Sequence, residues 1–232
     1  MLEVLRQEKK YVINFEQYYT LSHLFAQVLR EDKHSSGNGY TVRSLYFDSL
    51  DDRDYEEKIE GIDIRKKIRL RNYGPDSTHA KLEMKQKQGA MQRKRSLTLN
   101  PEQAKIVSTG DYSPLLEIDT EFSRECYGLM LMQCYRPKAV ISYTRKVFLA
   151  EENEIRITFD QCLKGTESCL DIFSENLVEN MLFDQSLVVM EVKYNGFLLS
   201  YIKDMINKVN AQEVAVSKYC IGRAIGKEYL YI

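Results

Sequence analysis

Two short runs of the sequence place basic side chains at alternate positions. They are Ile64-Arg-Lys-Lys-Ile-Arg-Leu-Arg71 and Ala80-Lys-Leu-Glu-Met-Lys-Gln-Lys87. Because successive side chains of a strand point to opposite faces, each run has one charged face and one largely apolar face. Arginine fits phosphate oxygens with a planar fork and lysine adds a movable positive charge, so such a face suits a phosphorylated anion. Its charged members are Arg65, Lys67, Arg69, Arg71, Lys81, Glu83, Lys85 and Lys87.

Four further alternating runs add charged side chains, so that six strands offer eleven cations and five anions. A basic surface with a few carboxylates is typical of phosphoryl transfer, in which cations spread over the phosphate oxygens and a carboxylate holds a divalent metal. Carboxylates without histidine or thiolate partners favour Mg²⁺ or Mn²⁺. The added residues are Glu8 and Lys10, Arg145 beside Tyr143, Glu154, Arg156 and Asp160, and Glu191 with Lys193.

Two arrangements are compatible with these charged faces. They could be the solvated outer surface of an antiparallel sheet whose apolar faces form the core. Alternatively, the strands close into a barrel with the basic faces inside, where the electric field is concentrated. The excess of cations favours the barrel, because like charges on neighbouring strands of a plain outer surface would repel each other. Such a lumen requires water and a polyanion, since unpaired buried charges are costly.

The charge is segregated along the chain. The 232 residues include 33 Lys and Arg and 34 Asp and Glu, a net charge of -1. The segment Lys58 to Arg95 holds twelve basic and four acidic residues, a net charge of +8, and the remainder carries -9. Near neutrality excludes a protein that coats DNA by bulk charge, but it does not exclude an enclosed polyanion.

The pattern of the remaining chain predicts an α+β protein with one domain over residues 1–232. Short alternating runs indicate strands, and Asn14 and Asn100 are expected to cap two of the helices. With four prolines, no low-complexity tract and no repeat, a linker is not evident. The predicted strands are 8–14, 40–48, 62–73, 80–87, 92–99, 138–149, 154–160 and 187–194, and the predicted helices are 16–30, 101–108, 120–134, 200–210 and 217–225.

The five cysteines show no CxxC pair and predict free thiols in a reducing compartment. The sequence has no signal-peptide core and no apolar run of about 18 residues, so we expect a cytoplasmic protein without a transmembrane segment. The acidic cluster from Asp48 to Asp54 lacks the glycine and terminal glutamate of a calcium loop and predicts a turn leading into a helix. The three histidines are scattered, and no GxxxxGK[ST] loop is present.

An ordered series of motifs over nearly the whole chain resembles the VTC domain, the polyphosphate polymerase domain of the vacuolar transporter chaperone complex and a branch of the triphosphate tunnel metalloenzymes. Each motif is weak alone, and their order is specific. The motifs are Glu8-Lys-Lys-Tyr11, Tyr40-Thr-Val-Arg-Ser-Leu-Tyr-Phe-Asp48, Tyr55-Glu-Glu-Lys58 with Gly61, Arg65-Lys-Lys-Ile-Arg-Leu-Arg-Asn-Tyr73, Leu82-Glu-Met-Lys85, Tyr143-Thr-Arg145, Ile155-Arg-Ile-Thr-Phe-Asp160, Glu191-Val-Lys193 and Ser217-Lys-Tyr219.

The resemblance implies an antiparallel eight-stranded tunnel with helices packed outside, and transfer of the γ-phosphate of ATP to polyphosphate with Mn²⁺ or Mg²⁺. It implies a metal at Glu191, with Glu83 and Glu8 as further candidates. The implied catalytic residues are Lys10, Arg69, Arg71, Lys85, Arg145, Arg156 and Lys218. The implied substrate contacts are these seven residues with Arg65, Lys67, Lys94, Tyr143, Lys193 and Ser217.

Two positions depart from the pattern of related proteins. Arg6 stands where the superfamily often has a first acidic residue, which weakens a two-metal hydrolase reading. Ala215 stands where the eukaryotic polymerases have a further lysine, so one phosphate contact is missing. We expect no counterpart of the regulatory domain and membrane segments of those polymerases, so that any membrane association would need a partner protein.

Three functions therefore stay open at the level of the sequence. The first is a metal-dependent polyphosphate polymerase that uses ATP. The second is a hydrolase of triphosphate or nucleoside triphosphates with water as the acceptor. The third is a non-catalytic module that binds polyphosphate or inositol phosphates. No nucleic-acid partner is expected for any of them.

Overall fold

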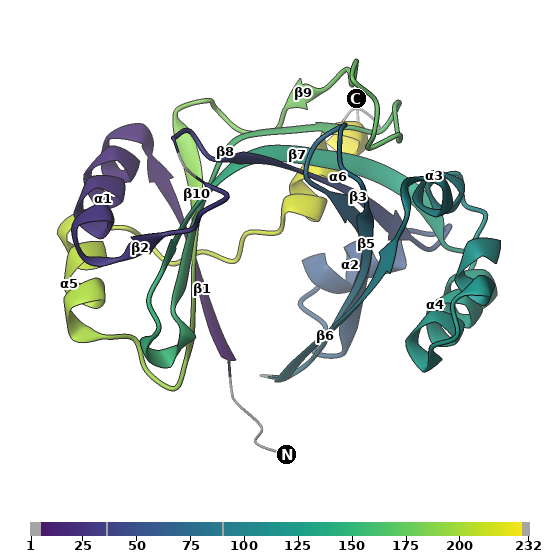
Figure 1. Cartoon of the computed structure of the whole chain (residues 1–232), viewed down its shortest axis with the longest axis horizontal. Helices are drawn as coiled ribbons and strands as arrows, with labels where there is room; N and C mark the ends of the chain where they lie inside the picture. The colour runs from purple at the N-terminus through teal and green to yellow at the C-terminus, as the bar shows by residue number, and fades with distance from the viewer. Residues whose placement is uncertain (1–5, 36, 90, 229–232) are drawn as a thin grey trace. The chain divides into compact units, whose positions relative to one another are not determined.

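The computed structural model describes residues 6–35, 37–89 and 91–228 (Figure 1). Its hydrogen-bonded strand order is β1-β10-β8-β7-β3-β4-β5-β6, with β2 joined to β7 and β9 joined to β8. Every strand pair whose register is determined is antiparallel. The predicted α+β class with eight principal antiparallel strands is therefore confirmed. Among the described residues, no helix combines the length and the apolar character needed to cross a bilayer.

The chain divides into two compact units, each assembled from three separate segments. Among the described residues, unit 1 comprises those within 6–41, 143–163 and 183–216, and unit 2 comprises those within 42–142, 164–182 and 217–228. Three of the five boundaries fall inside strands, so β3 (Tyr40–Asp48), β7 (Arg136–Leu149) and β8 (Arg156–Thr166) contribute residues to both units.

Unit 1 is a sheet covered on one face by helices α1 and α5, which lie beside β1 and β10 in Figure 1. Helix α1 begins after Asn14, whose side chain accepts a hydrogen bond from the backbone of Gln17 and forms a capping box, as predicted. The helix buries Leu21 and Phe25 in an apolar cluster with Phe159. The remaining elements of this unit are β1 (Arg6–Asn14), α1 (Phe15–Val28), β2 (Arg30–Glu31), η2 (Glu152–Glu154), β10 (Leu187–Asn195) and α5 (Ser200–Lys208).

Unit 2 contains the three basic strands and a larger core. Helices α3 and α4 lie along β5 and β6 in Figure 1, and the core under them includes Leu82 and Val107. Helix α3 begins after the predicted Asn100 cap. The elements are α2 (Arg53–Ile59), β4 (Arg65–Asn72), β5 (Ala80–Gln88), β6 (Met91–Leu99), α3 (Pro101–Ser108), η1 (Ser113–Glu117), α4 (Glu121–Met132), β9 (Asn180–Met181) and α6 (Lys218–Glu228).

The predicted elements are present, and most differ only slightly at their ends, but β8 continues to Thr166, six residues beyond its predicted end. The short strands β2 and β9 and the 3-10 helices η1 and η2 were not predicted. Strand β4 begins at Arg65 because its pairing with β5 starts at Arg65 opposite Lys87. Ile62 and Ile64, which the sequence pattern placed in this strand, lie exposed before it. All five cysteines are free thiols, as predicted.

The acidic cluster leads into helix α2, as the sequence predicted, and two of its members are buried, which the sequence analysis did not predict. Asp48 and Asp54 are both almost inaccessible to solvent. Asp54 accepts a hydrogen bond of 2.8 Å from the hydroxyl of Tyr135, and the ammonium group of Lys66 lies 3.5 Å from its other oxygen. Burial raises the pKa of Asp54 to about 7, because the attraction of Lys66 offsets only part of the lost hydration.

This raised pKa predicts a stability that falls as pH rises. Asp54 takes up a proton on folding between its unfolded pKa of 3.8 and its folded pKa of about 7, so its contribution is complete below pH 3.8 and is lost by about pH 7. We expect Asp54→Asn to remove about 2 to 4 kcal/mol of pH dependence from the free energy of unfolding over this range, measured with urea. The exposed neighbour variant Asp51→Asn should keep the slope; equal slopes for wild type and Asp54→Asn would contradict the assignment.

Candidate functional site

One face of β4, β5 and β6 in unit 2 gathers six of the thirteen predicted substrate contacts, and we call it the unit 2 basic face. Its register places Lys67, Lys85 and Lys94 in one row across the three strands. The next row is Arg69, Glu83 and Ser96, because partners in an antiparallel sheet point to the same side. The members of this face are Arg65, Lys67, Arg69, Arg71, Lys81, Glu83, Lys85, Lys87 and Lys94.

Glu83 is a buried carboxylate at the centre of this face. It accepts a hydrogen bond of 2.7 Å from Nε of Arg69, whose Nη2 lies 2.6 Å from the same oxygen. Arg71 lies 3.8 Å away, and Lys94 contacts the second carboxylate oxygen. Burial alone would raise the pKa of Glu83, but the attraction of Arg69 and Arg71 and the hydrogen bond from Lys94 outweigh it and lower the pKa to about 2.

Two polar residues of β3 join the unit 2 basic face, and the sequence analysis did not assign them to the site. Tyr46 lies opposite Arg69 and accepts a hydrogen bond of 3.3 Å from it, and Ser44 lies opposite Arg71 and accepts one of 3.3 Å. Burial favours the neutral phenol of Tyr46, but the nearby cations, Arg69 first, lower its pKa overall. Ser44 and Tyr46 alternate with the apolar Leu45, which is the signal that could have identified them.

The start of helix α6 adds the predicted Ser217 and Lys218 to unit 2. Lys67 donates a hydrogen bond of 2.6 Å to the hydroxyl of Ser217. Ser217 also accepts from the backbone of Cys220, so it caps the helix that begins at Lys218. The side chain of Lys218 is buried.

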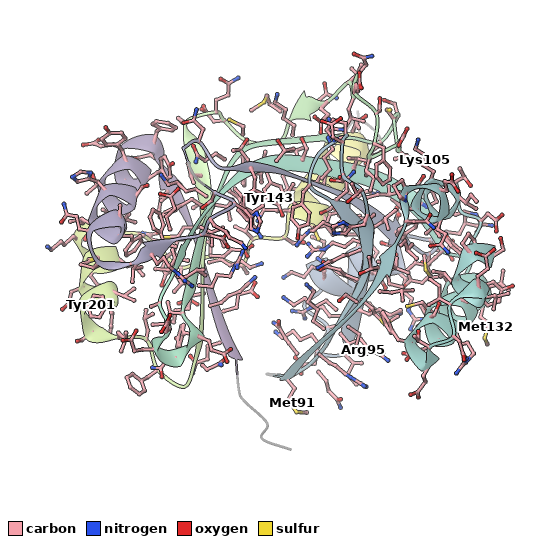
Figure 2. The ribbon with its side chains drawn as sticks, viewed as in Figure 1. Met91, Arg95, Lys105, Met132, Tyr143 and Tyr201 are labelled. Carbon is pink, nitrogen blue, oxygen red and sulfur yellow. The ribbon has the colours of Figure 1, made fainter. Side chains whose placement is uncertain are left out.

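Not every cation of the basic segment lies on the unit 2 basic face. Lys66 points to the opposite side, where it reaches Asp54. Arg95 also lies on that side of β6, toward α4, where it forms an ion pair with Glu125 and contacts the ring of Phe122 (Figure 2). These two residues serve packing, so the net charge of +8 overstates the charge that the site can use.

Unit 1 carries a second polar surface, on β1, β10, β8 and β7, which we call the unit 1 charged face. Lys10 pairs with Glu191 in register, and Glu8 pairs with Lys193, so that the four groups form a cluster. The ammonium group of Lys10 lies 3.2 Å from Glu8 and 3.8 Å from Glu191, and that of Lys193 lies 3.8 Å from Glu8 and 3.2 Å from Glu191. Its members are Glu8, Lys10, Tyr143, Arg145, Arg156, Asp160, Glu191 and Lys193.

Arg145 is the most firmly held cation of the unit 1 charged face. Its Nε and Nη2 donate hydrogen bonds of 2.6 and 2.7 Å to the two oxygens of Asp160, and its guanidinium lies 5.1 Å from the ring centre of Tyr143, which Figure 2 marks on β7. Although burial alone would lower the pKa of Arg145, the Asp160 carboxylate raises it well above its usual value. The sequence alternation placed Asp160 on the polar face, but not as the partner of Arg145.

Gly39 allows the loop before β3 to pass close to Arg145. Its φ is +92°, and a β-carbon there would lie 2.4 Å from the carbonyl oxygen of Arg145. Only glycine fits both the left-handed backbone and this approach. The remaining predicted cation, Arg156, lies 3.7 Å from Asp32 and is partly exposed.

Carboxylates that could hold a divalent ion come in a pair on the unit 1 charged face. Glu8 and Glu191 share Lys10 and Lys193 as neighbours, whereas Glu83 is surrounded by three cations. No cluster of three or more acidic, histidine or cysteine ligands exists among the described residues. Mg²⁺ commonly uses one or two carboxylates and completes its shell with water and substrate phosphates, so the oxygen donors of Glu8 and Glu191 suit such an ion.

The fold is similar to that of solved structures. The crystal structure of a "putative adenylate cyclase" from Bacillus halodurans is 14% identical, with a TM-score of 0.54, over 91% of this chain and 95% of that chain. A structure of the same description from Vibrio parahaemolyticus is 11% identical over 93% and 96%, with a TM-score of 0.48. A Pyrococcus horikoshii protein is 11% identical over 96% and 99%, also with a TM-score of 0.48. The Bacillus structure establishes the class of fold.

A sequence model of the VTC domain matches residues 5–226, nearly the whole chain, and the chain therefore belongs to the VTC domain family. The resemblance noted from the sequence motifs is confirmed. No curated protein sequence matches the chain. Family and fold together support a function in the chemistry of triphosphates or polyphosphate.

The low pKa of Glu83 predicts a loss of stability in acid. Its folded pKa of about 2 lies below the unfolded value of 4.5, so its contribution is complete above pH 4.5 and is lost as pH falls toward 2. We expect Glu83→Gln to remove about 2 to 3 kcal/mol of this pH dependence, measured as the free energy of unfolding between pH 5 and pH 2. Glu102→Gln, on an exposed part of α3, is the matched control and should behave as wild type.

Proposed function

We propose that this protein is a metal-dependent polyphosphate polymerase that transfers the γ-phosphate of ATP to the end of an inorganic polyphosphate chain. The observation that carries the proposal is the unit 2 basic face, where Arg69, Arg71 and Lys94 surround one carboxylate in a chain of the VTC domain family. Three cations around a single acceptor are more than a structural ion pair requires, and they match the several oxygens of a phosphate group.

On the unit 2 basic face, phosphate oxygens would take over hydrogen bonds that Glu83 now accepts. Arg69 offers a planar fork, and Lys67 and Lys85 lie in the adjacent row. A polyphosphate chain carries a negative charge on every phosphate, so several rows of cations can bind it at once. Affinity of this kind falls with added salt, because the contacts are electrostatic and partly exposed.

On the unit 1 charged face, Glu191 with Glu8 would hold Mn²⁺ or Mg²⁺, and Arg145 and Arg156 would bind phosphate oxygens. A divalent ion bound there would neutralise part of the negative charge on the phosphate oxygens during transfer. Asp160 keeps Arg145 charged and fixed in direction, which spares the cost of ordering it when substrate binds. Tyr143 covers the guanidinium on one side.

The proposed transfer needs no covalent intermediate with the protein. An oxygen of the terminal phosphate of the chain attacks the γ-phosphorus of ATP, and the bond from that phosphorus to the β-γ bridging oxygen breaks. ADP leaves with the electron pair, and the chain grows by one phosphate. The attacking oxygen is already ionised at neutral pH, so the residues contribute positioning and charge neutralisation instead of a general base.

The proposal predicts chain synthesis that depends on Glu191. Incubation of the protein with ATP and Mn²⁺ should yield ADP and long polyphosphate in equal phosphate equivalents, resolved on a gel by a polyphosphate stain. Glu191→Gln should lower the rate by at least about tenfold while tripolyphosphate binding is retained. Glu213→Gln is the control, because Glu213 pairs with Lys9 on an exposed surface.

The same assay separates the other two functions. Release of inorganic phosphate without chain growth would identify a hydrolase, and tight binding without metal or turnover would identify a binding module. The lysine pairs that already neutralise Glu8 and Glu191 favour the binding module as the second candidate. Either result would overturn the polymerase proposal.

Substitution of Glu83 tests whether this residue neutralises the neighbouring cations or binds the metal ion. If Glu83 competes with phosphate for Arg69, Arg71 and Lys94, Glu83→Gln should bind tripolyphosphate about threefold to tenfold more tightly, equivalent to about 1 kcal/mol. Mn²⁺ affinity, measured by calorimetry without nucleotide, should be unchanged. Weaker Mn²⁺ binding in Glu83→Gln would instead assign the metal to this residue.

A further inference from the structure

One buried carboxylate lies outside the unit 2 basic face but forms a hydrogen bond with a residue that contacts this face. Asp48, at the end of β3, is fully buried and accepts four hydrogen bonds. Its Oδ1 accepts from the backbone of Ser49 at 2.7 Å and of Asp54 at 2.8 Å, and its Oδ2 accepts from the backbone of Tyr55 at 2.9 Å. The fourth donor is the hydroxyl of Tyr219, which lies 2.6 Å from Oδ2.

Tyr219 connects this carboxylate to the unit 2 basic face. It is the second residue of α6, and its ring is buried. The ring stacks on Tyr46 with centroids 5.1 Å apart and planes at 23°, and Tyr46 in turn accepts a hydrogen bond from Arg69. The ammonium group of Lys67 lies 5.7 Å from the centre of the Tyr219 ring. Lys67 and Arg69, two cations of the face, therefore each contact one of these two aromatic residues.

The same tyrosine fixes the start of α6. Lys67 donates to Ser217, which caps the helix two residues before Tyr219. Since Asp48 also binds the first turn of α2, one carboxylate ties together β3, α2 and α6. Rotation or displacement of Tyr219 would move Ser217 and Lys218 and release Lys67 from its present direction.

We infer that Tyr219, anchored by Asp48, is a positioning residue that sets Lys67 and the start of α6 for phosphate binding. The inference rests on the proposed function, in which the unit 2 basic face binds a polyphosphate chain. Tyr219 itself offers no free donor to the ligand, because its hydroxyl proton is committed to Asp48. It acts through Lys67 and through Tyr46 beneath Arg69. Phosphate affinity should depend on it, although it bears no charge that a phosphate could use.

The test is Tyr219→Phe, which removes the anchoring hydrogen bond and keeps the ring. We expect its dissociation constant for tripolyphosphate, measured by calorimetry without ATP, to rise about fivefold to tenfold. Tyr112→Phe is the matched control, because the buried hydroxyl of Tyr112 donates to the carbonyl of Tyr135 at 2.7 Å away from the basic face. That variant should lose similar thermal stability and keep wild-type affinity.

A double-mutant cycle separates positioning from a general loss of stability. In a Lys67→Met background, Tyr219→Phe should cause a smaller loss of affinity than in the wild-type background, because one of the residues through which it acts is gone. In a Lys81→Met background, on the same face, the two losses should multiply. Multiplication in both backgrounds, or unchanged affinity in Tyr219→Phe, would overturn the inference.

A readout without ligand keeps this result distinct from failure of the proposed function. The rate at which Lys67 and Lys218 react with an acylating reagent, quantified by mass spectrometry, should rise at least threefold in Tyr219→Phe and stay at the wild-type value in Tyr112→Phe. If wild type binds no tripolyphosphate, the proposed function fails, and the acylation rates still decide the inference. Unchanged rates in Tyr219→Phe would refute it.

Discussion

Repulsion between cations on neighbouring strands is the constraint on which the two charged faces depend. Lys67, Lys85 and Lys94 occupy one row. In the next row Arg69 lies opposite Glu83, and without this carboxylate Arg69 would have only cations as its charged neighbours on the face. Each like-charge pair directly opposite in register destabilises the pairing of the strands. The structure places a carboxylate within each group of cations, and each carboxylate contacts two or three of them or binds one bidentately.

These carboxylates differ in how easily a ligand could replace their contacts with the cations. Asp160 binds Arg145 with both oxygens and is fully buried, so this pair is fixed. Glu83 divides its two oxygens among three partners, one of which, Lys94, is half exposed. A phosphate could replace the contacts of Glu83 more easily than those of Asp160, because Arg69 and Lys94 are partly exposed whereas Arg145 is buried with Asp160. The protein thus combines a rigid cation with an adjustable group, and the proposed phosphoryl transfer would use both.

The alternation of residues predicted much of the site, because period-two patterns are local. It placed Arg69 and Glu83 on equivalent faces, and the register confirms that they meet. The Asn14 and Asn100 caps were predictable for the same reason. The pairing of Arg145 with Asp160 could not be predicted, because it depends on which strands become neighbours. The burial of Asp54 was not predicted because its partner Tyr135 is 81 positions away, and the local sequence indicated only a turn leading into a helix.

The unit 1 charged face is built from segments that are far apart in the sequence, so it can form only after the last of them has been synthesised. Strand β1 pairs with β10, so Lys10 meets Glu191 only after about 180 further residues have been synthesised. Until then β1 has no partner on that edge, and its alternating charges keep an unpaired strand soluble. Contacts so distant in sequence slow folding, because the loop must close before the pairing is gained. The metal-binding carboxylates proposed here would therefore be among the last groups of the chain to come together during synthesis.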